Sequence, residues 1–350
     1  MKKAPLAAVL PVAGLFALIL VWPHRAWAWG PLAHLDFSGG ALSQLSLVPA
    51  AFRVLLAKCA DDFLYGSLAA DIIVGKNLAR YAVHCHNWKV GWKVFSRAKG
   101  EPQQAFALGF LAHLAADTVA HNYYVPYKTV EGFGVRRTGH AYWELRYDQK
   151  LSPELWQTAR RITGQSFRRH DEFLEEALSE SYVIPFGVSK RMFNQLLFAA
   201  RMKKYQAMSA VVAGEKDLPL TDEEVAETRR MAVAQILSML ADGEDGRANG
   251  ADPTGGRNLH FAVKLRQQLR EAERRRELDP GDAAEVLRQT RPAFRDAILG
   301  KLVLPEVPLR SEASAAARAA VEFAAEDTES TSAAQLEEEV VAHEANDDLP

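Results

Sequence analysis

The sequence predicts an all-α fold, a multi-helix bundle followed by a helical C-terminal extension. From residue 31 to about residue 150 it shows little of the sustained alternation of apolar and polar residues that a half-buried strand requires, and beyond residue 150 it continues helical. Apolar residues recur at helical spacing instead, and glycine or proline separates the segments, as at Gly100 and Pro102. With 48% hydrophobic residues in 350, the chain can bury a substantial core.

Apolar spacing and helix-stop residues define the expected helices in order. The segment from about 41 to 60 repeats leucine and phenylalanine at helical intervals, and 87–98 carries tryptophans four residues apart. A third helix, 103–121, ends shortly before a proline and a glycine-rich stretch. Later helices are expected at about 153–163, 168–180, 187–212, 221–242 and 259–277. Thr221 and Glu224 have the spacing of a capping box at the start of one of them.

The first 28 residues resemble a secretory signal rather than part of the fold. Two lysines precede an apolar run over 6–21, and Ala-Trp-Ala at 26–28 is a small-x-small cleavage site. An uncleaved membrane anchor is the alternative, but prolines and a glycine in and after the run disfavour a continuous spanning helix. We therefore expect cleavage before Trp29 and export to the periplasm or the exterior.

Composition divides the chain into six segments. They are a signal peptide (1–28), a helical core (29–150), its helical continuation (151–242), a linker (243–258), a helical extension (259–310) and a disordered tail (311–350). The linker is polar and rich in glycine, and the tail consists largely of alanine, serine and glutamate. The extension begins with a basic helix, which we expect to be a solvated charged face, with contact to anionic lipid headgroups as the alternative.

Charge and cysteine content exclude some classes of protein. A formal net charge of -2 gives no general support to nucleic-acid binding. Cys59 and Cys85 allow one disulfide but no disulfide scaffold. Cys85 stands between His84 and His86, where it can be a soft metal ligand, although an inert cysteine is the favoured interpretation.

The histidines concentrate in the first third of the chain. Of ten, six lie between residues 29 and 144, at positions 34, 84, 86, 113, 121 and 140. The segment HLAADTVAH places His113, Asp117 and His121 at successive four-residue intervals, which puts them on one stripe of a helix. Imidazole and carboxylate are the usual ligands of zinc. The stripe therefore predicts metal ligands, with Asp117 able to bridge two ions.

Further donors occur nearby. His140 and Glu144 repeat the four-residue spacing, a weak signal alone that gains weight because it follows the first motif. Asp71 is a candidate ligand, with a helix cap or turn as the ordinary alternative. Either His84 or His86 can be a ligand; we prefer His86, because it directly precedes a predicted helix.

Signal cleavage would create another donor group. The α-amine and the carbonyl of Trp29 can chelate a cation in a five-membered ring, with His34 as a nearby third donor. The amine has an ordinary pKa of about 8, so it loses its proton readily beside a dication. A frayed terminus is the ordinary alternative for a first residue.

Over residues 29–150 this pattern resembles the bacterial zinc-dependent phospholipase C family. The residues that carry the resemblance are Trp29, His34, Asp71, His84 or His86, His113, Asp117, His121, His140 and Glu144. The family is all-helical, begins its mature chain with a metal-binding tryptophan, and hydrolyses the glycerol-side phosphodiester bond of phospholipids. Its best known enzymes have a longer gap after the aspartate than the compact DTVAH found here.

The resemblance implies up to three zinc ions. Asp71, His86, His113 and Asp117 would hold the first, His121, His140 and Glu144 the second, and Trp29, His34 and Asp117 the third. Zinc lowers the pKa of a bound water to about 7, which permits attack on phosphorus at neutral pH. The resemblance also makes Asp71 the candidate general base, and a phospholipid or membrane surface the expected substrate.

Two alternatives remain. The short WGxxxH opening also resembles the related secreted zinc nucleases that cut single-stranded nucleic acid, although these tend to have aspartate where Glu144 stands. A nuclease would need base-stacking aromatics and a more basic groove. The third possibility is a non-catalytic, zinc-stabilised helical binding domain, in which the metal would have no open position for water.

Overall fold

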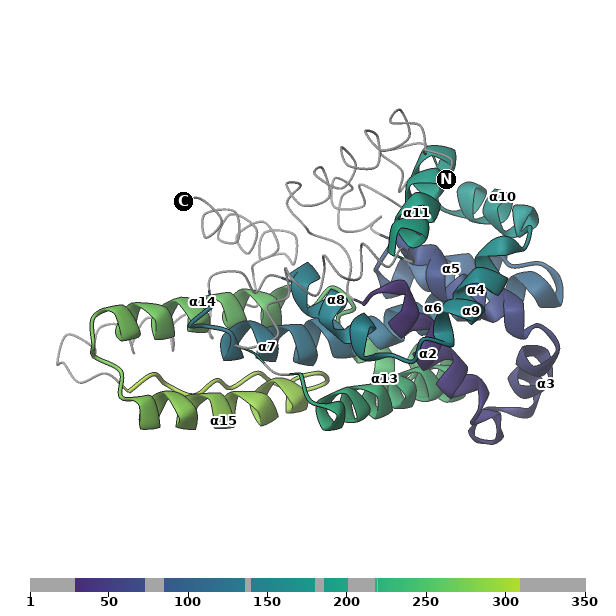
Figure 1. Ribbon diagram of the computed structural model, residues 1–350. Coiled ribbons are helices and arrows are strands. Elements are labelled where there is room, and N and C mark those ends of the chain that lie inside the picture. The colour runs from purple at the N-terminus through teal and green to yellow at the C-terminus, as the bar shows by residue number, and fades with distance from the viewer. Residues whose placement is uncertain are drawn as a thin grey trace, which may run out of the picture.

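Figure 1 shows the structure, a computed structural model of the chain. It describes residues 29–72, 85–135, 140–179, 186–200, 218 and 220–308, apart from a few side chains within helices such as that of His140. Regular structure in these ranges is helical throughout, and no strand occurs in them. The predicted all-α fold is confirmed. The predicted signal peptide and the tail beyond residue 310 lie outside the described residues.

The described helices lie between residues 31 and 296. The first nine are α2 (Pro31–Leu42), α3 (Ala50–Lys58), α4 (Ala60–Ala69), α5 (Trp88–Arg97), α6 (Gly100–Val119), α7 (Val125–Glu131), α8 (His140–Lys150), α9 (Leu155–Gly164) and α10 (Arg168–Ala177). The later ones are α11 (Phe186–Ala200), α13 (Asp222–Asp242), α14 (Gly256–Arg274) and α15 (Pro280–Asp296). Among the described residues, none of these helices has the length and apolarity needed to cross a bilayer.

The helix predicted over about 41–60 is not continuous in the structure. The segment expected to be helical from about 41 to 60 contains the end of α2, a 3-10 turn η1 (Leu45–Leu47), and α3. Helix α2 ends at Leu42, and α3 begins after Pro49, which disfavours helical backbone at the residue before it. Val48 is accordingly extended, with ψ of 147°.

Helix α6 is the centre of the fold. Every residue from Ala105 to Val119 is buried, which explains why apolar residues occur on all sides of this stretch. It packs against α4, α5, α13 and α2. Where α6 crosses α4, a Cβ at Gly109 would overlap the carbonyl oxygen of Phe63 and lie 2.9 Å from the backbone nitrogen of Ser67. The two helices therefore touch backbone to backbone.

This crossing positions polar side chains. His113 and Asp117 follow Gly109 at four-residue intervals, so they lie on the same stripe of α6. Helix α4 continues into a 3-10 turn, η2 (Ala70–Ile72), which carries Asp71. Because α4 and α6 cross one turn before these residues, Asp71 comes to lie beside His113.

The C-terminal helices extend the bundle. Figure 1 shows α14 and α15 beside α7, at the end of the molecule remote from α3. Helix α13 begins with the predicted capping box between Thr221 and Glu224, which is confirmed. The buried Nζ of Lys128 in α7 donates to Glu224 at 2.7 Å and to Glu131 at 2.6 Å. The ion pair with Glu224 joins α7 to α13.

Candidate metal centre

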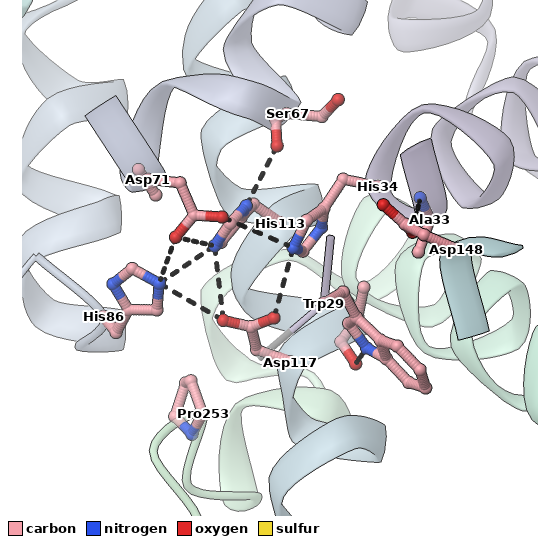
Figure 2. A network of polar contacts seen from close by, with 12 residues as sticks. Trp29, Ala33, His34, Ser67, Asp71, His86, His113, Asp117, Asp148 and Pro253 are labelled. Atoms are coloured by element: carbon pink, nitrogen blue, oxygen red, sulfur yellow. Dashed lines mark hydrogen bonds and ion pairs between the residues drawn. The ribbon is translucent and has the colours of Figure 1, made fainter. Parts of the chain in front are cut away.

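Five predicted ligands converge on one buried cluster (Figure 2). They come from four places in the chain: His34 from α2, Asp71 from η2, His86 from the residues before α5, and His113 and Asp117 from α6. None is more than 3% exposed. Segments that are distant in sequence thus bring three imidazoles and two carboxylates together in the core.

Asp117 lies between the three imidazoles. Its Oδ2 is 3.2 Å from Nε2 of His113 and 3.3 Å from Nε2 of His86. Its Oδ1 is 3.5 Å from Nε2 of His34. Neither oxygen accepts a hydrogen bond from the described residues. A buried carboxylate is costly unless it is paired with a cation or hydrogen-bonded, so this position suits a carboxylate bound to a positive ion.

Asp71 faces the same imidazoles from the other side. Its Oδ1 is 3.5 Å from Nε2 of His86 and 3.8 Å from Nε2 of His113, and its Oδ2 is 4.0 Å from Nε2 of His34. The donor atoms form two groups that can each hold a metal, His34 with Asp71 and His113, and His86 with His113 and Asp117. Within each group all donor atoms lie within 4.8 Å of one another.

Contacts behind the rings orient two of the histidines. Nδ1 of His113 lies 2.9 Å from the carbonyl oxygen of Ser67, which can only accept, so Nδ1 carries the proton. The thiol of Cys85 donates to the carbonyl of Ala70 at 3.7 Å, and its sulfur lies 3.2 Å from Nδ1 of His86. In the tautomer with Nδ1 protonated, His86 donates to this sulfur and Nε2 carries the lone pair. Both rings turn Nε2 toward the carboxylates.

This donor set fits a metal ion. The Nε2 atoms of His86 and His113 are 2.9 Å apart, and both lie within 3.3 Å of Oδ2 of Asp117. Zinc binds imidazole nitrogen at roughly 2.0–2.1 Å and carboxylate oxygen at roughly 2.0–2.2 Å. Donors separated by 3.2 to 3.5 Å can share one ion at such distances. Imidazole and carboxylate are also the ligand types that zinc uses.

The cysteines contribute no donor atom to these groups. Cys59 and Cys85 are both buried free thiols. Cys85 lies behind His86, where its contacts orient the imidazole rather than add a ligand. The possible disulfide and the soft-ligand interpretation of Cys85 are therefore not supported.

Trp29 is anchored next to the cluster. Its indole is fully buried, and Nε1 donates to the carbonyl of Ala116 at 3.1 Å, one residue before Asp117. The ring stacks on Tyr124, with centroids 4.9 Å apart, and contacts Tyr147 at 4.6 Å. These contacts fix the side chain of the residue that we expect to become the N-terminus.

The second predicted ligand trio is described in part. His121 lies in a π-helical turn, η5 (Ala120–Tyr124), which continues α6 directly. It is buried, as is Glu144 on α8. His140 is the first residue of α8, but its side chain lies outside the described residues, and so does the whole of His84. These residues remain predicted ligands.

Asp148 was not predicted as a site residue. Its Oδ1 accepts the backbone N–H of Ala33 at 3.1 Å, at the start of α2, and a Cβ at Gly30 would overlap its carboxyl group. Withdrawal of that group from water raises the pKa of Asp148 to about 8, opposed by hydrogen bonds from the N–H groups of Ala33 and Leu32. Asp148 thus holds the beginning of the helix that carries His34. The sequence does contain one indication of its place, because Asp148 follows Glu144 by four residues and so lies on the same face of α8.

Comparison with known proteins gives one result. The model of the zinc-dependent phospholipase C family matches residues 33–185. The match extends beyond residue 150, where the resemblance was expected to end, and so includes α9 and α10. Neither the curated proteins nor the solved structures contain a significant match to the chain.

The matched region contains the complete cluster of His34, Asp71, His86, His113 and Asp117. The family requires zinc, and the cluster has donor atoms that can hold it. The buried donor cluster therefore lies within the range that the family model matches. Over residues 33–185 the chain is therefore similar to the zinc-dependent phospholipase C family.

Proposed function

We propose that the protein is a zinc-dependent phospholipase C, which hydrolyses phospholipids to diacylglycerol and a phosphorylated headgroup. The observation that carries the proposal is the buried cluster of three imidazoles and two carboxylates inside the family-matched region. Zinc bound there would supply the Lewis-acid chemistry that activates water and polarises the phosphoryl group. A phospholipid at a membrane surface is then the substrate.

Within this cluster we propose Asp71 as the general base. Its carboxylate faces the same space as the Nε2 atoms of His86 and His113, at 3.5 and 3.8 Å. From there it can accept a proton from water as the water oxygen bonds to phosphorus. The bond between phosphorus and the glycerol oxygen breaks, and that oxygen takes up a proton as diacylglycerol leaves.

We propose that the ligands divide among three ions as the resemblance implies. Asp71, His86, His113 and Asp117 hold the first, His121, His140 and Glu144 the second, and Trp29, His34 and Asp117 the third. Support for a shared carboxylate comes from Asp117, whose two oxygens face different imidazoles. A bridging aspartate needs this arrangement.

A substrate comparison tests the function. We expect zinc-loaded protein beginning at Trp29 to release diacylglycerol and a phosphorylated headgroup from phosphatidylcholine and phosphatidylethanolamine in mixed micelles. A chelator should stop the release, and added zinc should restore it. The same preparation should leave a single-stranded oligonucleotide intact. Cleavage of the oligonucleotide without lipid hydrolysis would favour a nuclease, and zinc binding without either activity would favour a non-catalytic domain.

We further propose that the chain is exported and cleaved before Trp29, so that the α-amine of Trp29 becomes a ligand. The buried, hydrogen-bonded indole supports this, because it holds residue 29 beside Asp117. We expect one extra residue ahead of Trp29 to reduce bound zinc by one ion per chain, measured by elemental analysis alongside protein that begins at Trp29. An extended protein with the full zinc content would contradict the N-terminal chelate.

A further inference from the structure

Residues 249–258 lie beyond the family-matched region and pack against it. They were expected to belong to a polar linker, but most of their side chains are buried. Trp88 and Trp92 of α5 donate to the carbonyl of Ala251 at 2.7 Å and to the side chain of Asn249 at 2.9 Å. These bonds fasten the segment to the helix that follows His86.

The same segment is bonded to the π-helical turn that carries His121. Nδ2 of Asn122 donates to the carbonyl of Asp252 at 2.7 Å, and Nδ2 of Asn258 donates to the carbonyl of Asn122 at 3.0 Å. Between these anchors, Asp252 accepts hydrogen bonds from N and Oγ1 of Thr254 at 3.0 and 2.8 Å, which fixes the local turn. Residues 251–255, here called the 251–255 loop, are therefore held in one conformation against η5.

The loop makes a specific contact with His121. Nδ1 of the His121 ring is hydrogen-bonded to the carbonyl oxygen of Pro253. A carbonyl oxygen can only accept, so Nδ1 must carry the proton and Nε2 the lone pair. A histidine that binds metal through Nε2 needs this tautomer, and backbone carbonyls commonly provide it in metal sites.

Close approach of Gly255 makes this contact possible. Its φ of +60° is in the left-handed region that favours glycine. A Cβ at this position would overlap the carbonyl oxygen and Cβ of His121. Any other residue would therefore push the loop away from His121 or strain its backbone.

We propose that the 251–255 loop is a positioning element of the second metal site, through the hydrogen bond from His121 to Pro253. The inference rests on the proposed function, because it takes His121 as a zinc ligand. It extends that function by giving residues beyond 185 a role in the site. The family-matched region supplies the ligand, and the C-terminal part of the chain sets the tautomer and the direction of its ring.

Gly255→Ala tests the proposal, with Gly250→Ala as the matched control. A Cβ at Gly250 would meet only Leu299, at 3.8 Å, and Gly250 does not contact His121. In the full mature chain we expect Gly255→Ala to weaken the binding of one zinc ion per chain by roughly 10- to 100-fold, the usual effect of losing such a supporting contact. Competition with a chromophoric chelator measures this affinity. Gly250→Ala should bind all its zinc as the unaltered protein does.

A second measurement needs no loop variant. Long-range ¹H–¹⁵N NMR spectra of the zinc-free protein, assigned with His121→Ala, should show His121 protonated at Nδ1. A proton at Nε2 would overturn the proposal. So would a folded Gly255→Ala protein that binds every zinc ion with unchanged affinity, or one in which the affinity for all the zinc ions falls equally. Neither readout requires hydrolysis, so a protein that passes both tests and fails the lipid assay contradicts the proposed function alone.

Discussion

Replacing Asp117 with asparagine should lower the rate of phospholipid hydrolysis by at least about a thousand-fold and reduce the zinc content of the purified protein. The substitution keeps the shape of the side chain but removes its charge, and turns an N–H₂ group toward imidazole lone pairs at 3.2 to 3.5 Å. A metal contributes several kcal/mol to such a reaction, and each 1.36 kcal/mol is a factor of ten in rate. His113→Ala should have the same two effects.

The matched control is Asp296→Asn, the same chemical change at the exposed end of α15. This variant should retain zinc and activity. Elemental analysis and the micelle assay, with circular dichroism to show that each variant folds, distinguish the two positions. If folded Asp117→Asn retained its zinc and its rate, Asp117 would not be a ligand.

Gly109→Ala should reduce the free energy of unfolding by about 3 kcal/mol, near the upper end of the range for overpacked sites. The added methyl group would overlap the carbonyl of Phe63, which is backbone and cannot rotate away. Helices α4 and α6 would have to separate, and this would also move Asp71 away from His113. Chemical denaturation of the zinc-free protein measures the effect without a contribution from metal binding.

Gly39→Ala provides the comparison for this prediction. Gly39 also lies inside a helix, α2, but a Cβ there would meet no atom within 4 Å. Since alanine favours helix over glycine by about 1 kcal/mol, this variant should be as stable as the unaltered protein or slightly more stable. Equal stability of Gly39→Ala and Gly109→Ala would show that α4 and α6 are not in backbone contact.

The parts of the fold that could be predicted from sequence depend on local spacing. Apolar periodicity identified helices such as α5, α6 and α13, but not α2, α4, α7 or α15. The four-residue interval placed His113 and Asp117 on one face of α6. Pro49 disfavours one continuous helix over residues 41–60, and α3 begins directly after it. Contacts between helices could not be predicted in this way. Local spacing does not show that Gly66 of α4 and Gly109 of α6 lie at the crossing of these two helices.

The candidate site was predictable to the extent that its donors are side chains. Residue type and spacing had made each member of the buried cluster a candidate ligand, and His86 lies in it, while His84 lies outside the described residues. The groups that orient these side chains were not predictable, because two of them are backbone carbonyls, of Ser67 and Pro253. Every residue has a carbonyl, so only the folded chain shows which ones face a histidine.

Anomalous diffraction at the zinc absorption edge, from crystals of the zinc-loaded protein beginning at Trp29, tests the central claim most directly. The account predicts zinc peaks within coordination distance of the donors in the buried cluster, with Asp117 contacting at least one of them. Zinc bound only at surface positions, with the imidazoles and carboxylates of the cluster bonded to one another, would contradict it.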